Sequence, residues 1–176
     1  LAGYESYNLK LQELQGSNTK IYNPTIGELN NAIASPPRVA SFTNEYTTMG
    51  YLARIQYDYD EKYFVSASYR RDASSRFHPD NRWGNFGSVG LAWLINKENF
   101  MSNVSWIDML KFKASYGIQG NDNLGNYYAY ADQYSVTNSN GDFAVSFSYK
   151  GNKDITWETS YAFNTGFDFE LLGNRL

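Results

Sequence analysis

Large apolar or aromatic side chains alternate with small or polar ones in five segments of this chain, each long enough to cross a bilayer. The clearest segment carries Tyr161, Phe163, Thr165, Phe167, Phe169 and Leu171, interleaved with Ser160, Ala162, Asn164, Gly166, Asp168 and Glu170. Because successive side chains of a strand point to opposite faces, the pattern predicts one apolar face and one hydrated face. Such strands are typical of the wall of a transmembrane β-barrel.

The composition agrees with this prediction. Aromatic residues make up 18% of the 176 residues, yet the mean hydropathy is -0.56, so aromatic surface is abundant while aliphatic core is scarce. No run of about twenty apolar residues is present, which excludes a transmembrane helix. The net charge of -3 argues against a nucleic-acid partner, whose phosphates need a basic face. The chain has no cysteine, so neither a disulfide framework nor a thiolate metal site is expected.

The alternation divides the chain into strands and connections. We expect a strand end over 1–7, full strands over about 49–59, 63–72, 88–95, 110–119 and 155–171, and short turns at 60–62, 96–105 and 173–174. Two long loops are expected, at about 8–44 and 120–154. The first contains a short helix around 25–34 and the pair Pro36 and Pro37, and the second contains a strand from Phe143 to Tyr149 that projects beyond the membrane.

Short and long connections alternate strictly along the chain. In outer-membrane barrels the short turns are periplasmic and the long loops extracellular, which predicts the orientation. About six strands are too few to close a barrel. We therefore predict an all-β fold in which residues 1–176 form one antiparallel segment of a larger transmembrane β-barrel domain. No signal peptide opens the chain, and since a barrel wall is exported, we expect a mature or internal piece of a longer protein.

Four stretches carry a family resemblance, at Tyr63–Phe77, Pro79–Gly84, Trp106–Asn121 and Ile155–Ser160. In this order they resemble the C-terminal barrel portion of SusC/RagA-type TonB-dependent outer-membrane transporters, over most of residues 46–172. Ala73 stands where that family usually has glycine, and Leu94 where a polar or basic residue is common. The TonB box and the plug domain of the family are not in these residues.

The resemblance implies a Gram-negative outer-membrane importer with a barrel of about 22 strands. Its cargo would be oligosaccharides or other large nutrients, among which peptides are an option. No cofactor is expected. Its partners would be a SusD-like surface lipoprotein, outer-membrane lipid and TonB, which acts through the absent N-terminal region.

Two groups of side chains are candidates for substrate contact. A charged cluster surrounds the outer end of one hairpin and consists of Arg70, Arg71, Asp72, Arg76, Asp80 and Arg82. Mixed charges pair readily, so we favour an ion-pair network there over a substrate contact. Tyrosines in the second long loop could stack on sugars, or pack against one another or a lid partner. The candidate substrate-binding residues are Tyr127, Tyr128, Tyr130, Arg76 and Arg82.

The remaining residues point away from catalysis. His78 is the only histidine, which removes most triads and histidine-rich metal sites, so we expect neither an enzyme nor a metal centre. Asp58 and Asp60 are interpreted as turn residues. Trp83, Trp93, Trp106 and Trp157 are expected in interfacial girdles. The alternatives are a soluble β-sandwich carbohydrate-binding module and a different outer-membrane barrel, either a siderophore receptor or a porin.

Overall fold

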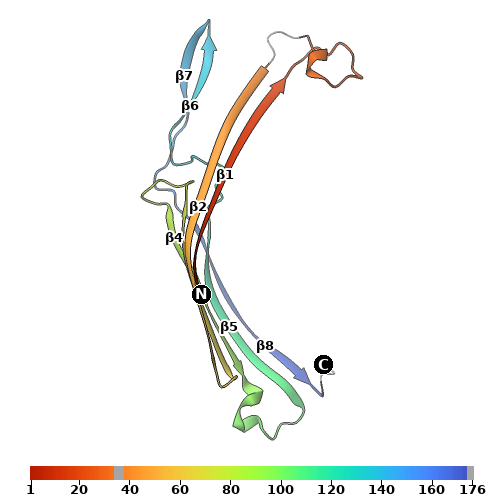
Figure 1. The fold of residues 1–176 in the computed structure, drawn as a ribbon, viewed down its shortest axis with the longest axis vertical. Helices are drawn as coiled ribbons and strands as arrows, with labels where there is room; N and C mark the ends of the chain where they lie inside the picture. Colours follow the sequence, from red (N-terminus) through yellow and green to blue (C-terminus); the bar gives the residue numbers. More distant parts are fainter. Residues whose placement is uncertain (34–37, 174–176) are drawn as a thin grey trace. The chain divides into compact units, whose positions relative to one another are not determined.

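The computed structural model describes residues 1–33 and 38–173, and it is built almost entirely from antiparallel strands. The strands are β1 (Ala2–Ser17), β2 (Arg38–Tyr59), β3 (Tyr63–Ser74), β4 (Trp83–Leu94), β5 (Ile107–Asn121), β6 (Gln133–Ser139), β7 (Asp142–Tyr149) and β8 (Glu158–Leu171). Three short 3-10 helices are η1 (Leu29–Asn31), η2 (Ile95–Lys97) and η3 (Asn99–Met101). One sheet has the order β1-β2-β3-β4-β5-β8, and β6 and β7 form a separate hairpin (Figure 1).

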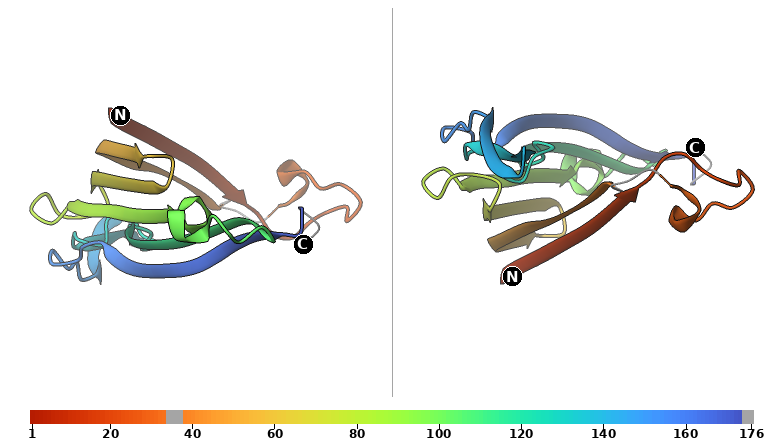
Figure 2. Two further views of the ribbon diagram at one scale, coloured as in Figure 1. Left: turned by 90° about the horizontal axis from the view of Figure 1, so that it is seen from below. Right: turned by 90° about the horizontal axis from the view of Figure 1, so that it is seen from above.

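The chain forms two compact units. The larger comprises residues 1–7 and 47–176, and its strands β3, β4, β5 and β8 follow one another side by side in a single layer (Figure 2). Its short-turn end carries the connections 60–62, 95–106 and 172–173, and its long-loop end carries the connections 75–82 and 122–157.

The smaller unit, residues 8–46, contains the remaining parts of β1 and β2 and their connection. Lys10 pairs with Glu45 at 3.1 Å. The Asn31 side chain donates to the carbonyl oxygens of Asn23 and Ile26, at 2.5 and 2.8 Å, and so closes the connection on itself.

The register of the large sheet confirms the two predicted faces. One row across the strands is Tyr57, Val65, Leu91, Ala114 and Thr165, and the adjacent row is Gln56, Ser66, Gly90, Ser115 and Asn164. We call the surface of the first row the apolar face and that of the second row the polar face. The apolar face is open, because Leu91 is 51% and Phe167 is 58% exposed. A soluble β-sandwich would turn these side chains inward.

Both loop predictions need correction. Residues 8–17 and 38–44 of the loop predicted over 8–44 are strand, since β1 continues to Ser17 and β2 begins at Arg38. In the described part of the predicted helix at 25–34, only the single turn η1 is helical. Pro36 and Pro37 lie outside the described residues, as does Asn174 of the predicted final turn. The loop predicted over 120–154 contains the expected strand, β7, together with the unpredicted β6.

The tight hairpin between β2 and β3 confirms the turn predicted at 60–62. Asp60 and Glu61 both adopt positive φ, 55° and 49°, and Lys62 N donates to the Tyr59 carbonyl at 3.0 Å. Two successive positive φ values give a turn whose twist matches that of the flanking strands.

Aromatic side chains mark both ends of the apolar face. At the long-loop end, Tyr4 lies 5.3 Å and Trp83 lies 6.2 Å from Tyr51, measured between ring centroids. At the short-turn end, Trp93 stacks on Tyr63 at 6.2 Å. Trp83 and Trp93 are ten residues apart on β4, which corresponds to about 33 Å along the strand. With the usual tilt of barrel strands this interval spans about 25 Å of membrane, the height of the apolar band in such barrels.

Hydrogen bonds to one carboxylate hold the aromatic girdle residues Tyr63 and Trp93 in place at the short-turn end. Glu98 Oε1 accepts hydrogen bonds from Tyr63 Oη at 2.5 Å and from Trp93 Nε1 at 3.0 Å. The hydrogen bond from Tyr63, followed by that from Trp93, lowers the pKa of the Glu98 carboxyl. Nearby, the hydrogen bond from Lys97 lowers the pKa of Glu61. The carboxylate therefore holds two girdle rings in one orientation.

Candidate functional site

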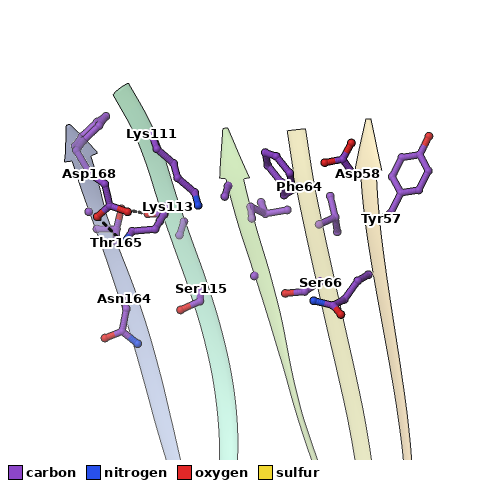
Figure 3. A pocket seen from close by; sticks show the side chains of 18 residues that line it. Tyr57, Asp58, Phe64, Ser66, Lys111, Lys113, Ser115, Asn164, Thr165 and Asp168 are labelled. Atoms are coloured by element: carbon purple, nitrogen blue, oxygen red, sulfur yellow. Dashed lines mark hydrogen bonds and ion pairs between the residues drawn. The ribbon is translucent and has the colours of Figure 1, made fainter. Parts of the chain in front are cut away.

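The polar face carries two hollows, and its side chains come from β2, β3, β4, β5 and β8. The first, which we call the lysine hollow, has a volume of about 730 Å³ and lies near the short-turn end (Figure 3). Its floor is formed by Gly90, Ala92 and Gly166, which are small enough to leave the space open. Lys111 and Lys113 stand at its edge. The hollow therefore forms because small residues on β4 and β8 lie beside the long lysine side chains of β5.

Charged, amide and aromatic groups share the lysine hollow. Lys113 Nζ pairs with Asp168 Oδ1 at 2.6 Å, and both side chains are about half exposed. Lys111 Nζ lies 5.9 Å from the centroid of the Phe64 ring. Gln56, Ser66, Ser115 and Asn164 add neutral donors and acceptors. An exposed ion pair of this kind contributes about 1 kcal/mol or less to stability, so these groups remain available to a polar solute.

The second hollow, the arginine hollow, has a volume of about 560 Å³ and lies toward the long-loop end. Arg70 Nε donates to both carboxylate oxygens of Asp72, at 2.7 and 2.8 Å, and Arg70 Nη2 pairs with Glu5 at 2.8 Å. A side chain at position 50 would place its Cβ 2.0 Å from Asp72 Oδ1, so this pairing requires Gly50. The Ser68 and Ser88 hydroxyls share a hydrogen bond at 2.7 Å.

A small buried core closes the long-loop end. Phe77 is 0% exposed, and Ala73, Ser74 and Ala129 are also buried. The Phe77 ring lies 5.4 Å from that of Trp157. We call this core and the residues around it the rim. The predicted substrate residues lie there.

Arg76 is held within this rim. Its Nη1 donates to the Asp122 carbonyl at 3.1 Å and to Asn123 Oδ1 at 3.2 Å, and its guanidinium lies 5.2 Å from the Tyr127 ring. The Asp122 carboxylate also accepts a hydrogen bond from Ser74 Oγ at 2.6 Å. Only 15% of the Arg76 side chain is exposed. Arg76 thus joins the β3–β4 connection to the end of β5.

The other predicted substrate residues are dispersed. Tyr128 lies beside Tyr127, with 6.5 Å between ring centroids, whereas Tyr130 contacts His78 at 6.0 Å. The Arg82 carbonyl accepts a hydrogen bond from Trp157 Nε1 at 2.9 Å. The structure therefore brings together Arg76, Tyr127 and Tyr128, while Tyr130 and Arg82 have other neighbours. Substrate contact by any of the five stays a prediction.

The predicted charged cluster separates into four environments. Arg70 and Asp72 pair on the polar face, Arg76 lies in the rim, and His78 Nδ1 lies 3.3 Å from Asp80. Arg71 lies elsewhere, 5.1 Å from the Trp83 ring on the apolar face. The favoured ion-pair interpretation thus describes the contacts made by Arg70 and Arg76.

Sequence reasoning misplaced Trp157 and overlooked the lysine hollow. Trp157 packs edge-on against Phe86 at 5.1 Å and lines the arginine hollow, so its prediction as a girdle residue is wrong. Trp157 falls in the strand predicted over 155–171, but β8 begins only at Glu158, so strand parity does not determine which face Trp157 lies on. The lysine hollow left one signal in the sequence, namely Lys111 and Lys113 at alternate positions of one strand.

Among residues 1–33 and 38–173, no helix has both the length and the apolar character that crossing a membrane requires. Histidine and acidic side chains in the same part of the chain do not gather in groups of three or more that could hold a metal ion.

Comparisons with known proteins find relatives of this chain among TonB-dependent receptors. TonB-dependent receptor P39 of Formosa agariphila is 42% identical over 127 residues, which is 70% of this chain and 12% of the relative. TonB-dependent receptor SusC of Bacteroides thetaiotaomicron is 33% identical over 143 residues, covering 77% of this chain and 14% of the relative. No family model matches. This chain therefore spans roughly an eighth of the length of its curated relatives.

A solved structure agrees with the sequence relatives. The RagAB peptide transporter superposes with a TM-score of 0.86 and 26% identity, over 99% of this chain and 19% of that chain. The likeness confirms the predicted outer-membrane β-barrel fold and the location in the outer membrane. On the combined evidence of sequence and sheet, this chain belongs to the SusC/RagA-type family of TonB-dependent outer-membrane receptors.

Proposed function

We propose that this chain forms part of the barrel wall of a TonB-dependent importer of large polar nutrients, oligosaccharides or peptides. The observation that carries the proposal is the division of one sheet into an open apolar face and a polar face with two hollows. Lipid covers the first face and the second lines a wet lumen. The wall itself performs no catalysis.

The chemistry of the polar face supports a polar cargo. The lysine hollow offers cationic, anionic and amide groups beside the Phe64 ring, so it matches hydroxyl-rich or peptide solutes better than apolar ones. Its half-exposed groups form weak pairs, which a passing solute can exchange for its own hydrogen bonds. Energy reaches the intact protein through TonB, and a SusD-like surface lipoprotein delivers the nutrient.

The test is uptake by the intact receptor in its own cells. We expect uptake of a labelled oligosaccharide or peptide mixture to stop when TonB is deleted. In a receptor with Lys111→Glu and Lys113→Glu, uptake should fall several-fold at unchanged surface abundance, because the hollow loses its cations.

Lys97→Glu is the matched control. Lys97 is also a lysine near the short-turn end, but it pairs with Glu61 in the connections rather than on the polar face. Uptake that continues without TonB would mean a passive porin, and uptake restricted to iron chelates would mean a siderophore receptor. Equal uptake by the Lys111/Lys113 and Lys97 variants would remove the role of the hollow.

A further inference from the structure

Two polar side chains interrupt the apolar face near its long-loop end. Arg71 of β3 and Asn85 of β4 are register partners, and both are exposed. They lie an even number of residues from Val65 and Leu91 on the same strands, so their side chains share the apolar face. A charged guanidinium and an amide therefore stand on the surface that meets lipid.

No carboxylate of the described residues pairs with Arg71. Within residues 1–33 and 38–173 its guanidinium makes no hydrogen bond, and its contact is the Trp83 ring, whose centroid lies 5.1 Å from Cζ. The preceding residue behaves differently, because Arg70 pairs with Asp72 and Glu5 on the polar face. The donors of Arg71 thus remain available to a ligand.

Asn85 supplies a second donor group beside Arg71. Its Oδ1 accepts a hydrogen bond from Tyr69 Oη at 2.7 Å. Its Nδ2 has no acceptor in the part of the chain that the structure describes. Residues directly opposite each other on antiparallel strands have Cα atoms about 5 Å apart. The two unused sets of N–H groups are therefore neighbours, as the recognition of an anion with several oxygens requires.

The position of Arg71 along β3 sets its depth in the membrane. Arg71 lies two residues from Ala73, the register partner of the girdle residue Trp83, and its guanidinium reaches back to that ring. A long charged side chain at such a level extends to the headgroup region. Long loops of outer-membrane barrels are extracellular, so this region belongs to the outer leaflet.

The strands on both sides of Arg71 are part of the described chain. Its register partners are Tyr51 on β2 and Asn85 on β4. Strands of the barrel that lie outside this chain therefore do not flank the guanidinium within the sheet. The open side of Arg71 is the side on which lipid lies against the wall.

We propose that Arg71 and Asn85 form a binding site for the phosphate of an outer-leaflet lipid, which in a Gram-negative outer membrane is lipopolysaccharide. Guanidinium binds phosphate with two parallel hydrogen bonds, and the Asn85 amide adds a further donor. The apolar residues toward the middle of the sheet contact the acyl chains. The inference goes beyond nutrient import and uses the outer-membrane location and the lipid contact of the apolar face.

The experiment is native mass spectrometry of the intact receptor in detergent micelles, titrated with phosphorylated lipid A. We expect Arg71→Gln to weaken binding of the tightest-bound molecule at least tenfold, because charge-assisted hydrogen bonds are lost. Arg54→Gln is the matched control. Arg54 is an exposed arginine of the neighbouring strand β2, but it lies on the polar face, so its removal should leave the affinity unchanged.

Asn85→Asp gives a second test of the same site. The new carboxylate can still accept the hydrogen bond from Tyr69, but it loses the amide donor, pairs with Arg71 and repels phosphate. We expect at least a tenfold loss of affinity here as well. Surface abundance of every variant is measured in cells to exclude a folding defect. Unchanged affinity in both variants at normal abundance would overturn the proposal.

Three further ligands distinguish the sources of phosphate. Dephosphorylated lipid A and phosphatidylglycerol should each bind the unaltered receptor at least tenfold more weakly, and inorganic phosphate at millimolar concentration should not displace lipid A. Equal binding of either lipid, or displacement by inorganic phosphate, would overturn the assignment to the outer-leaflet lipid. TonB-dependent uptake by the unaltered receptor is independent of these outcomes, so failure of the lipid site and failure of the proposed function are separate results.

Discussion

The two faces of the large sheet share every strand, yet different neighbours constrain them. On the apolar face, Val89 lies between Ala67 and Tyr116, and the row continues into exposed aromatic rings. On the polar face, Ser88 lies between Ser68 and Gly117, where small residues leave room for water and solute. The residues of the apolar face thus suit contact with hydrocarbon. The residues of the polar face suit the space that they leave free for water and solute.

The largest expected effect comes from placing the same charge on each face in turn. Val89 lies near the middle of the interval between Trp83 and Trp93, so Val89→Arg should destabilise the receptor by about 2–4 kcal/mol. Ser88→Arg, one residue away on the other face, should cost only about 1 kcal/mol, chiefly the lost hydrogen bond to Ser68.

Guanidinium unfolding of the intact receptor in phospholipid vesicles, followed by tryptophan fluorescence, measures both values. Equal destabilisation by the two substitutions would break the comparison, because it would mean that both faces meet the same surroundings.

A smaller effect is expected where the polar side of the sheet is tightly packed. The Phe86 ring lies over Gly120, and a Cβ at that position would fall 2.1 Å from the end of the ring. Gly120→Ala should therefore cost about 1–3 kcal/mol, as overpacking does.

Gly117→Ala on the same strand is the control. Its nearest neighbour, Ser88 Cβ, is at an ordinary contact distance of 3.5 Å, so its unfolding free energy should change by about 0.5 kcal/mol or less. If the two alanines cost the same in guanidinium titrations, the arginine hollow is less closely packed than the structure indicates.

The smallest effect concerns the boundary of the apolar face. Because the pKa of Glu98 is lowered in the folded state, its hydrogen bonds to Tyr63 and Trp93 stabilise the receptor above the ordinary carboxyl pKa. That stabilisation is lost as the pH falls through the lowered value. Glu98→Gln should remove this part of the acid sensitivity. The melting temperature of the variant should therefore fall less on acidification than that of the unaltered receptor.

Melting temperatures of the receptor and of the Glu98→Gln variant between pH 3 and 7 provide the measurement. A variant that loses stability on acidification as steeply as the unaltered receptor would show that this carboxylate does not anchor the girdle.

The sequence predicted the strands best where a bilayer imposes two faces. The alternation over 63–72 and 110–119 fixed both the strands and their faces, because lipid and water act on alternate residues. It failed for residues 8–17 and 38–46, where β1 and β2 continue without a sustained apolar side. Such a strand has no periodic signal. β6 was also missed, although Asn140 and Gly141 form the dipeptide most typical of a tight hairpin.

The candidate site was less predictable than the sheet. Arg76 and Tyr127 meet only because the β3–β4 connection folds onto the end of β5, which no local pattern encodes. Lys113 and Asp168 meet across neighbouring strands, and their pairing depends on a register that the sequence alone leaves undetermined. Side chains that are distant in the chain therefore needed the structure.

The interval between Trp83 and Trp93 has a consequence for sorting. A belt spacing of about 25 Å suits the thin bacterial outer membrane, whereas a typical bilayer core is about 30 Å thick. In a typical bilayer, the indoles of Trp83 and Trp93 would lie below the headgroup level that they prefer. The apolar band of the barrel would then be shorter than the hydrocarbon layer around its whole circumference. The wall is thereby fitted to its destination and poorly matched to the membrane that it leaves behind during export.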